Sequence, residues 1–204
     1  MERTRPYDID SLTDIAFRLF AQRGFDATPM DEIAKAAAIT KASIYHHVPG
    51  KEALLARGLD RALAALFAIL DETAAKEGTP RARLETIVGR VAEITMRMFP
   101  EVSVLFRVRG NSKTELEAMG RRRDFDAIVT DLIRAAQREG TVRSDIDAAL
   151  IARLVFGMSN SVVEWYRPNG RIGAREIAAA ISRLVFEGAA EPPKIDGSAR
   201  EAIE

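Results

Sequence analysis

The chain has 204 residues, of which 47% are hydrophobic, and its 30 basic side chains balance 30 acidic ones. This length allows one domain, or a small domain joined to a larger one, to bury a core. The sequence contains no cysteine, which excludes disulfide scaffolds and thiolate metal sites. Because no apolar run reaches the ~18 residues of a membrane span and residues 1–10 are too polar for a signal peptide, we expect a soluble, cytoplasmic protein without a membrane partner.

The first predicted helix covers residues 8–23 and is expected to support the segment that follows it. Its apolar side chains recur at the spacing of one buried helix face. They are Leu12, Ile15, Ala16, Leu19 and Phe20. Gly24 marks the end of this helix, because glycine commonly follows the last helical turn.

Residues 28–54 carry a pattern typical of two short helices followed by the start of a third. Thr28 and Thr40 are placed to cap the first two helices, and Pro49-Gly50 ends the second and opens the third. Three side chains of the second helix are expected to point back toward the first: Ile44, His47 and Val48. Such a helix-turn-helix places its second helix in the major groove of DNA.

The outward face of this second helix supplies the predicted DNA contacts. The residues expected nearest the base edges are Lys41, Ala42 and Ser43. The residues expected at phosphates or the groove wall are Thr28, Tyr45, His46 and Lys51. Packing against the first helix is the alternative for Tyr45, whereas His47 is expected to brace the core.

A family resemblance rests on the run from Gly24-Phe25 through Ile33-Ala34, Ile39-Thr40-Lys41, Ile44-Tyr45-His46-His47 and Lys51-Glu52-Ala53-Leu54. This run is similar to the DNA-binding domain of TetR-family transcriptional regulators. The resemblance implies a ligand-responsive repressor that binds a palindromic operator as a homodimer and is released by a small effector.

The sequence departs from the family pattern at three positions. Ala38 and Ala42 stand where the family usually has glycine, and Val48 stands where it usually has phenylalanine. If the turn requires a positive φ at Ala38, alanine costs on the order of 1 kcal/mol there.

Charge gives little support to DNA binding, because residues 1–51 hold seven basic and seven acidic side chains. Binding would then depend on a few placed phosphate contacts, with a moderate dependence on salt. A second interpretation, favoured by this balance and by Ala38, is a helical ligand-binding or partner-binding protein of the same fold without operator binding.

Beyond residue 50, the apolar spacing again predicts only helices, separated by glycine and proline. They are expected over residues 51–75, 81–99, 101–109, 114–139 and 144–167, with a last one ending near residue 188. Thr114 and Ser144 are the predicted caps of the helices that they begin. The sequence therefore predicts an all-α fold of about nine helices. Its predicted parts are a helix-turn-helix domain in 1–50, a helical effector-binding and dimerisation domain in 51–188, and a flexible tail in 189–204.

The last two helices carry more apolar surface than one terminal hairpin normally hides, which favours self-association as a homodimer. The residues predicted at this interface are Ile151, Val155, Met158, Val162, Ile177, Ile181 and Leu184. The alternative is that this stripe is ordinary core. A dimer would present two recognition helices to successive major-groove faces about 34 Å apart.

A middle layer of apolar residues predicts a cavity for a largely apolar effector. The predicted lining residues are Phe67, Phe99, Val102, Leu105, Phe106, Arg109, Met119, Phe125, Met158 and Trp165. Each apolar member alone is more typical of core. Arg107, Arg109 and the run 121–123 are either a solvated surface or partners for a carboxylate or phosphate of the effector. The run 162–168 is similar to a helix end in TetR-like regulators of fatty-acid and aromatic-acid breakdown, some of which respond to acyl-CoA thioesters. The resemblance therefore points to an acyl-CoA or another acidic effector.

The sequence also argues against an enzyme. His46 and His47 are its only histidines, and adjacent helical residues point about 100° apart, so they cannot share a metal. Phosphate-cradling glycine loops and nucleophile elbows are missing as well. We therefore expect no catalytic residues, no metal and no cofactor.

Overall fold

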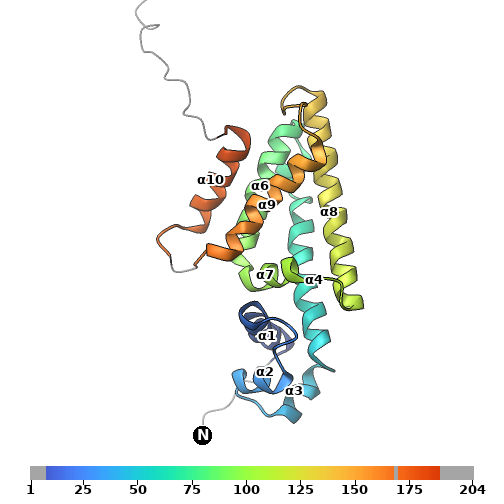
Figure 1. The fold of residues 1–204 in the computed structure, drawn as a ribbon, viewed down its shortest axis with the longest axis vertical. Coiled ribbons are helices and arrows are strands. Elements are labelled where there is room, and N and C mark those ends of the chain that lie inside the picture. Colours follow the sequence, from blue (N-terminus) through green and yellow to red (C-terminus); the bar gives the residue numbers. More distant parts are fainter. Residues whose placement is uncertain (1–7, 168–169, 189–204) are drawn as a thin grey trace, which may run out of the picture.

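The computed structural model describes residues 8–167 and 170–188, and within them every regular element is an α-helix. This confirms the predicted all-α fold (Figure 1). The helices are α1 (Ile9–Arg23), α2 (Met30–Ala36), α3 (Lys41–His47), α4 (Lys51–Ile69), α5 (Thr73–Lys76), α6 (Pro80–Arg97), α7 (Phe99–Arg107), α8 (Lys113–Arg138), α9 (Ala148–Trp165) and α10 (Ala174–Phe186). The predicted tail, residues 189–204, lies outside the described residues. None of the helices described is long and apolar enough to cross a membrane.

The described part of the chain has ten helices where about nine were predicted, because the helix expected over residues 51–75 is interrupted. The amides of Leu70, Asp71 and Glu72 each donate to the carbonyl three residues earlier. This tighter pattern is typical of a helix end. Glu72 then adopts an extended conformation, and the short helix α5 follows it.

Several helix caps test the sequence patterns directly. Thr40 Oγ1 accepts a hydrogen bond from Ser43 N at 3.1 Å, which confirms the predicted cap of α3. The predicted cap at Thr28 is wrong, because α2 is preceded by Pro29 and has no side-chain cap. The other two predicted caps are also wrong: Ser112 caps α8 in place of Thr114, and Asp147 caps α9 in place of Ser144.

Helices α1, α2 and α3 form a small unit at one end of the molecule (Figure 1). Its core includes Phe17 and Phe20, whose rings meet edge to face with centroids 5.5 Å apart. Gly58 of α4 lies so close to Phe17 that a Cβ at this position would overlap the ring. Helix α4 therefore packs closely on α1 before it continues into the larger part of the molecule. The division after residue 50 stays a prediction.

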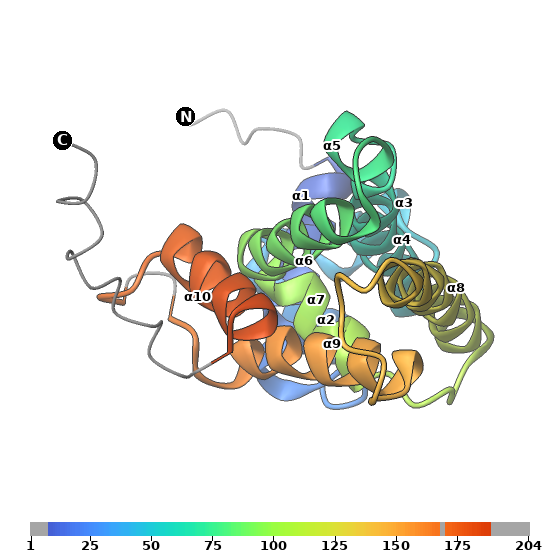
Figure 2. The ribbon, with the colours of Figure 1, turned by 90° about the horizontal axis from the view of Figure 1, so that it is seen from above.

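The larger part is built from α4, α6, α8 and α9, with α7 between this bundle and α1. Helix α10 lies beside α6 at the edge of the bundle (Figure 2). An ionic chain joins the two parts: Arg61 of α4 pairs with Asp14 of α1 at 2.7 Å and with the buried Glu101 of α7 at 3.4 Å. This ionic chain connects α7 to α1 through Arg61 of α4.

Candidate nucleic-acid interface and effector cavity

Helix α3 is held to the core along one side and exposed along the other. Ile44 and Val48 are 0% and 2% exposed, and they anchor the helix to the unit formed by α1 and α2. The predicted DNA-contacting residues Lys41, Ala42, Tyr45 and His46 are exposed together, and Ser43 is half-buried beside them. Tyr45 does not pack into the core, because 47% of it is exposed. His47, expected in the core, is exposed, so that prediction is wrong.

The turn between α2 and α3 depends on an unusual backbone at Ala38. Its φ is 51°, and it is the only described residue other than glycine with a positive φ. Glycine adopts this conformation without the steric cost that a Cβ brings. The amide of Ile39 donates to the carbonyl of Ala34 at 3.0 Å and closes the end of α2. Alanine therefore adopts the required turn, and the strain remains in the folded protein.

Thr28 and Lys51, both predicted at phosphates, hold the connection between α1 and α2. Thr28 is fully buried, and its hydroxyl donates to the Gly24 carbonyl at 2.7 Å. Lys51 Nζ donates to the Phe25 carbonyl at 2.7 Å and lies 4.3 Å from the centroid of the Phe25 ring. The Thr28 hydroxyl is therefore not available to a phosphate. Lys51 is only half-buried, and its contact with a phosphate stays a prediction.

Lys41 is the basic residue on the exposed face of α3, and it has an acidic neighbour. Its Nζ lies 2.8 Å from Asp31 Oδ1, and the hydrogen bond to this carboxylate raises the pKa of Lys41. Lys41 therefore stays charged, and it must leave Asp31 to reach a phosphate or a base. Exposed pairs of this kind contribute little energy, so the exchange is inexpensive.

A large cavity of about 1060 Å³ lies between α4, α6, α7, α8 and α9. Much of its wall is apolar, including Leu66, Val91, Val102, Phe106, Phe125, Phe156 and Val163. The ring of Phe125 lies 5.9 Å from that of Phe156, and these two rings line one side together. A cavity with this lining and size suits an organic ligand with a large apolar body.

Arginines outnumber acidic residues in the lining of the same cavity. Its arginines are Arg107, Arg109, Arg122, Arg123, Arg134 and Arg153, and its acidic residues are Asp126, Asp131 and Glu164. Burial raises the pKa of Asp126, although Arg122 and Arg153 act in the opposite direction. Arg134 is engaged by Asp131 at 2.7 Å. The excess of arginine favours a ligand that carries negative charge.

Four of the predicted effector residues, Val102, Phe106, Arg109 and Phe125, line this cavity. The other six lie elsewhere. Leu105 is core, Phe67 packs edge-on against Phe125, and Phe99 packs against Tyr166. Met119 is packed beside the main core, Met158 lines a second cavity of about 490 Å³, and Trp165 is 50% exposed.

Sequence reasoning missed several polar residues of the cavity, notably Ser103, Asp126 and Asn160. The available signal was helical spacing: Ser103 and Arg107 lie one turn apart on α7, and Arg122 and Asp126 lie one turn apart on α8. Spacing alone could not show that both faces turn toward one cavity, because this depends on how α7 and α8 cross.

The predicted dimer residues divide into buried and exposed groups. Val155, Val162, Ile177 and Ile181 are at most 7% exposed and belong to a core cluster within one chain. For them the alternative, ordinary core, holds, because α10 packs mainly on α6. Ile151 and Met158 are partly buried against the same cluster. Leu184 remains 47% exposed.

Comparisons with known proteins agree with both parts of this architecture. Residues 12–57 match the family described as bacterial regulatory proteins, tetR family, and residues 77–189 match the tetracyclin repressor-like C-terminal domain. The HTH-type transcriptional repressor KstR2 of Rhodococcus jostii strain RHA1 is 32% identical over 186 residues, which cover 89% of this chain and 90% of the relative.

Solved structures give the same result. SCO3833, a TetR-family member from Streptomyces coelicolor A3, is 50% identical, with a TM-score of 0.83 over 88% of this chain and 91% of that chain. The ketosteroid transcriptional regulator KstR2 of Mycobacterium tuberculosis is 25% identical, with a TM-score of 0.78 over 90% and 95% of the two chains. These relatives are regulators and not enzymes. The chain belongs to the TetR family of transcriptional regulators.

Proposed function

We propose that this chain is a repressor that binds a palindromic operator as a homodimer and is released by a small, largely apolar effector with an acidic or acyl-CoA group. The observation that carries the proposal is the pairing of an anchored, outward-facing α3 with a large arginine-lined cavity in the same chain. The similarity to a transcriptional repressor over 89% of the chain supports the direction of regulation.

The proposed DNA interface is the exposed face of α3. Lys41, Ala42 and Ser43 lie in its first turn, where side chains of a recognition helix reach base edges. Tyr45 and His46 follow on the exposed surface and are assigned to the groove wall and phosphates. Thr28 is assigned a supporting role, since its hydroxyl bonds to a backbone carbonyl, and Lys51 keeps its predicted place at a phosphate.

The proposed dimer face is the exposed apolar side of α9 and α10. Leu150, Leu154 and Trp165 of α9 are 45%, 59% and 50% exposed, and Leu184 of α10 is 47% exposed. Gly157 and Ser161 lie between the α9 residues on the same exposed side. Small residues there allow two helices to approach closely, and a two-fold axis would bring equivalent faces together.

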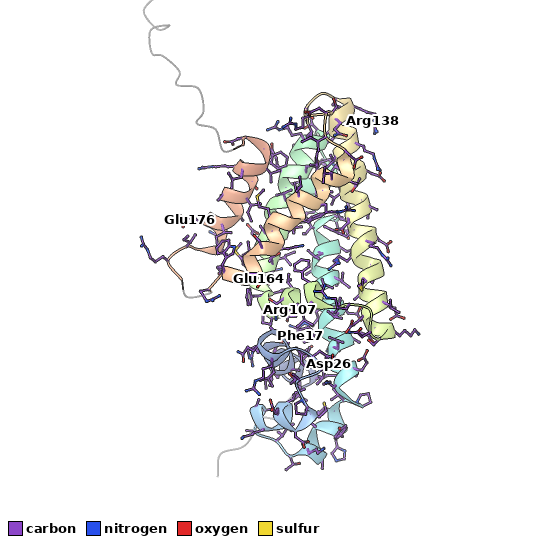
Figure 3. The ribbon with its side chains drawn as sticks, viewed as in Figure 1. Phe17, Asp26, Arg107, Arg138, Glu164 and Glu176 are labelled. Atoms are coloured by element: carbon purple, nitrogen blue, oxygen red, sulfur yellow. The ribbon has the colours of Figure 1, made fainter. Side chains whose placement is uncertain are left out.

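A competition experiment with duplexes selected from a random library tests the DNA assignment. Ser43→Ala is expected to change the preferred site, whereas Tyr45→Ala is expected to weaken binding to every duplex. Arg138→Ala is the control, because it removes a positive charge at the far end of the molecule (Figure 3). Unchanged preference in Ser43→Ala would overturn the assignment of α3. Failure of the wild type to retain any duplex in dilute buffer would favour a ligand-binding protein without operator binding.

A further inference from the structure

One buried hydroxyl in α7 is unlike the other polar groups of the described core. Ser103 is 1% exposed, and its Oγ has no hydrogen-bond partner among the residues that the structure describes. Ser103 also belongs to the wall of the large cavity. A buried hydroxyl without a partner is costly, so such groups normally pair with a bound molecule or serve a function. This unpaired hydroxyl therefore indicates where a polar atom of a ligand belongs.

Arg107 lies one helical turn after Ser103 and has a second role. It lines the same cavity, while its Nη1 donates to the carbonyl of Ala21 in α1 at 2.6 Å. Figure 3 places Arg107 where α7 meets α1. The unit formed by α1, α2 and α3 is the proposed DNA-binding unit. Of the six arginines in the cavity lining, Arg107 is the one with a hydrogen bond to this unit among the residues described. It therefore belongs to the cavity and to the contact with α1 at once.

We infer that Ser103 and Arg107 form the polar end of the effector site, and that an effector oxygen held by Ser103 draws Arg107 away from the Ala21 carbonyl. The inference rests on the proposed function, because it needs an effector in this cavity. The α7 helix sets both groups on one side, one turn apart, so a single polar group can reach both. A charged acceptor competes well for Arg107, because its hydrogen bond is stronger than that of a neutral carbonyl.

The chemistry of these two residues defines the effector group. Ser103 donates one hydrogen bond, and Arg107 presents a planar set of donors that suits oxygen atoms with negative charge. The group is therefore a free carboxylate at the end of an apolar body; the neutral thioester carbonyl of an acyl-CoA can accept from Ser103 but does not outcompete the Ala21 carbonyl for Arg107. Release of Ala21 loosens the contact between α7 and α1, and this changes the orientation of the DNA-binding unit.

Binding measurements with three probes test the role of Ser103. The probes are decanoate, decanoyl-CoA and S-decyl-CoA, a thioether that lacks the carbonyl oxygen. Ser103→Ala is expected to weaken whichever oxygen-bearing probe binds by about five- to tenfold, and to leave S-decyl-CoA unaffected. Weaker binding of decanoate by Ser103→Ala indicates a carboxylate, and weaker binding of decanoyl-CoA indicates a thioester. Equal affinity of wild type and Ser103→Ala for both oxygen-bearing probes overturns the inference and leaves the proposed function standing.

Thermal unfolding of the ligand-free protein gives an independent test. Ser159 is the matched control, because it is also 1% exposed, but its hydroxyl donates to the Val155 carbonyl at 3.4 Å. Ser103→Ala is expected to keep or raise the Tm, whereas Ser159→Ala is expected to lower it. If Ser103→Ala lowers the Tm as much as Ser159→Ala does, the inference is overturned. If none of the three probes binds wild type, the effector class in the proposed function is wrong. The comparison of the two Tm values then tests on its own whether the Ser103 hydroxyl is unpaired.

The coupling role of Arg107 is tested by measuring the affinity for DNA without a probe and with the probe that binds wild type. The ratio of these two affinities reports the coupling. Arg107→Ala is expected to bring this ratio close to one. Arg109→Ala is the matched control, because Arg109 lines the cavity without a contact to Ala21, and it is expected to keep a ratio above one at saturating probe. A wild-type ratio in Arg107→Ala at saturating probe overturns the coupling.

Discussion

At the scale of single residues, Ala38 shows that a family pattern can be broken while the conformation behind it is kept. Its φ of 51° is the conformation that glycine adopts without steric penalty. Ala38→Gly is therefore expected to raise the free energy of unfolding by about 0.5–1 kcal/mol, after the entropic cost of glycine is included.

Chemical denaturation of Ala38→Gly and of a control measures this effect. Ala36→Gly is the control, since Ala36 is also exposed but lies within α2. There glycine is expected to lower the free energy of unfolding by roughly 0.5–1 kcal/mol. Destabilisation of both variants would contradict the strain at Ala38.

Glu115 is a second residue with a local structural task. Its Oε2 accepts hydrogen bonds from the amides of Arg109, Gly110 and Asn111 at 2.8–3.0 Å. Burial raises the pKa of Glu115, but these three donors outweigh it and hold the pKa below its usual value. The lowered pKa means that this carboxylate stabilises the fold above its unfolded pKa of about 4.3, and that the contribution is lost as pH falls further.

The expected result is that Glu115→Gln lowers the free energy of unfolding by about 1–3 kcal/mol at neutral pH. The difference from wild type should shrink as pH falls below the ordinary glutamate pKa of about 4.3 and the wild-type carboxylate takes up a proton. Urea unfolding between pH 3 and about pH 7 measures both effects. A difference that stays constant over this range would contradict the charged role of Glu115.

At the scale of helices, the close contact of α4 with α1 determines how the DNA-binding unit is attached. Gly58→Ala would place a methyl group against the buried ring of Phe17. The variant is expected to lose about 1–3 kcal/mol of stability through overpacking, with parallel loss of DNA binding. Gly120→Ala in α8 is the control, because its new Cβ meets no atom within 4 Å. A stability of Gly58→Ala equal to that of Gly120→Ala would contradict this close contact.

Helices were the part of the fold that the sequence predicted best. Apolar periodicity marks a buried face wherever it recurs, so the main helices and the anchoring residues Ile44 and Val48 could be predicted. Thr40 was predicted correctly as a cap, but the caps of α8 and α9 were not, because Thr114 and Ser144 compete with Ser112 and Asp147 for similar backbone amides. Thr28 does not cap α2, because its hydroxyl is buried and donates to the Gly24 carbonyl.

The candidate sites were harder to predict, because they depend on packing between distant helices. Periodicity showed that Val155 and Ile181 pack against an apolar surface. It could not show whether that surface belongs to a second chain or to the same chain, as it does here. Lys51 is similar: its position at the start of α4 favours an anion, but tertiary packing brings the Phe25 carbonyl to its ammonium group. Arg107 was noted for its charge, and its bond to Ala21 needed the structure.

At the scale of the whole molecule, the exposed apolar side of α9 is expected to control assembly. Leu154→Glu places a charge in the proposed dimer face and is expected to weaken self-association by about tenfold or more. Leu116→Glu is the control, because Leu116 on α8 is 57% exposed, close to the 59% of Leu154. Sedimentation velocity over a concentration series measures both. Equal self-association of the two variants would place the interface elsewhere.

Native mass spectrometry of the chain with a library-selected duplex tests the central claim most directly. The predicted particle contains two identical chains on one duplex, and it loses the duplex when the probe that occupies the cavity is added. A single chain on the duplex, or a complex that keeps its duplex with the cavity occupied, would contradict a dimeric repressor released by its effector.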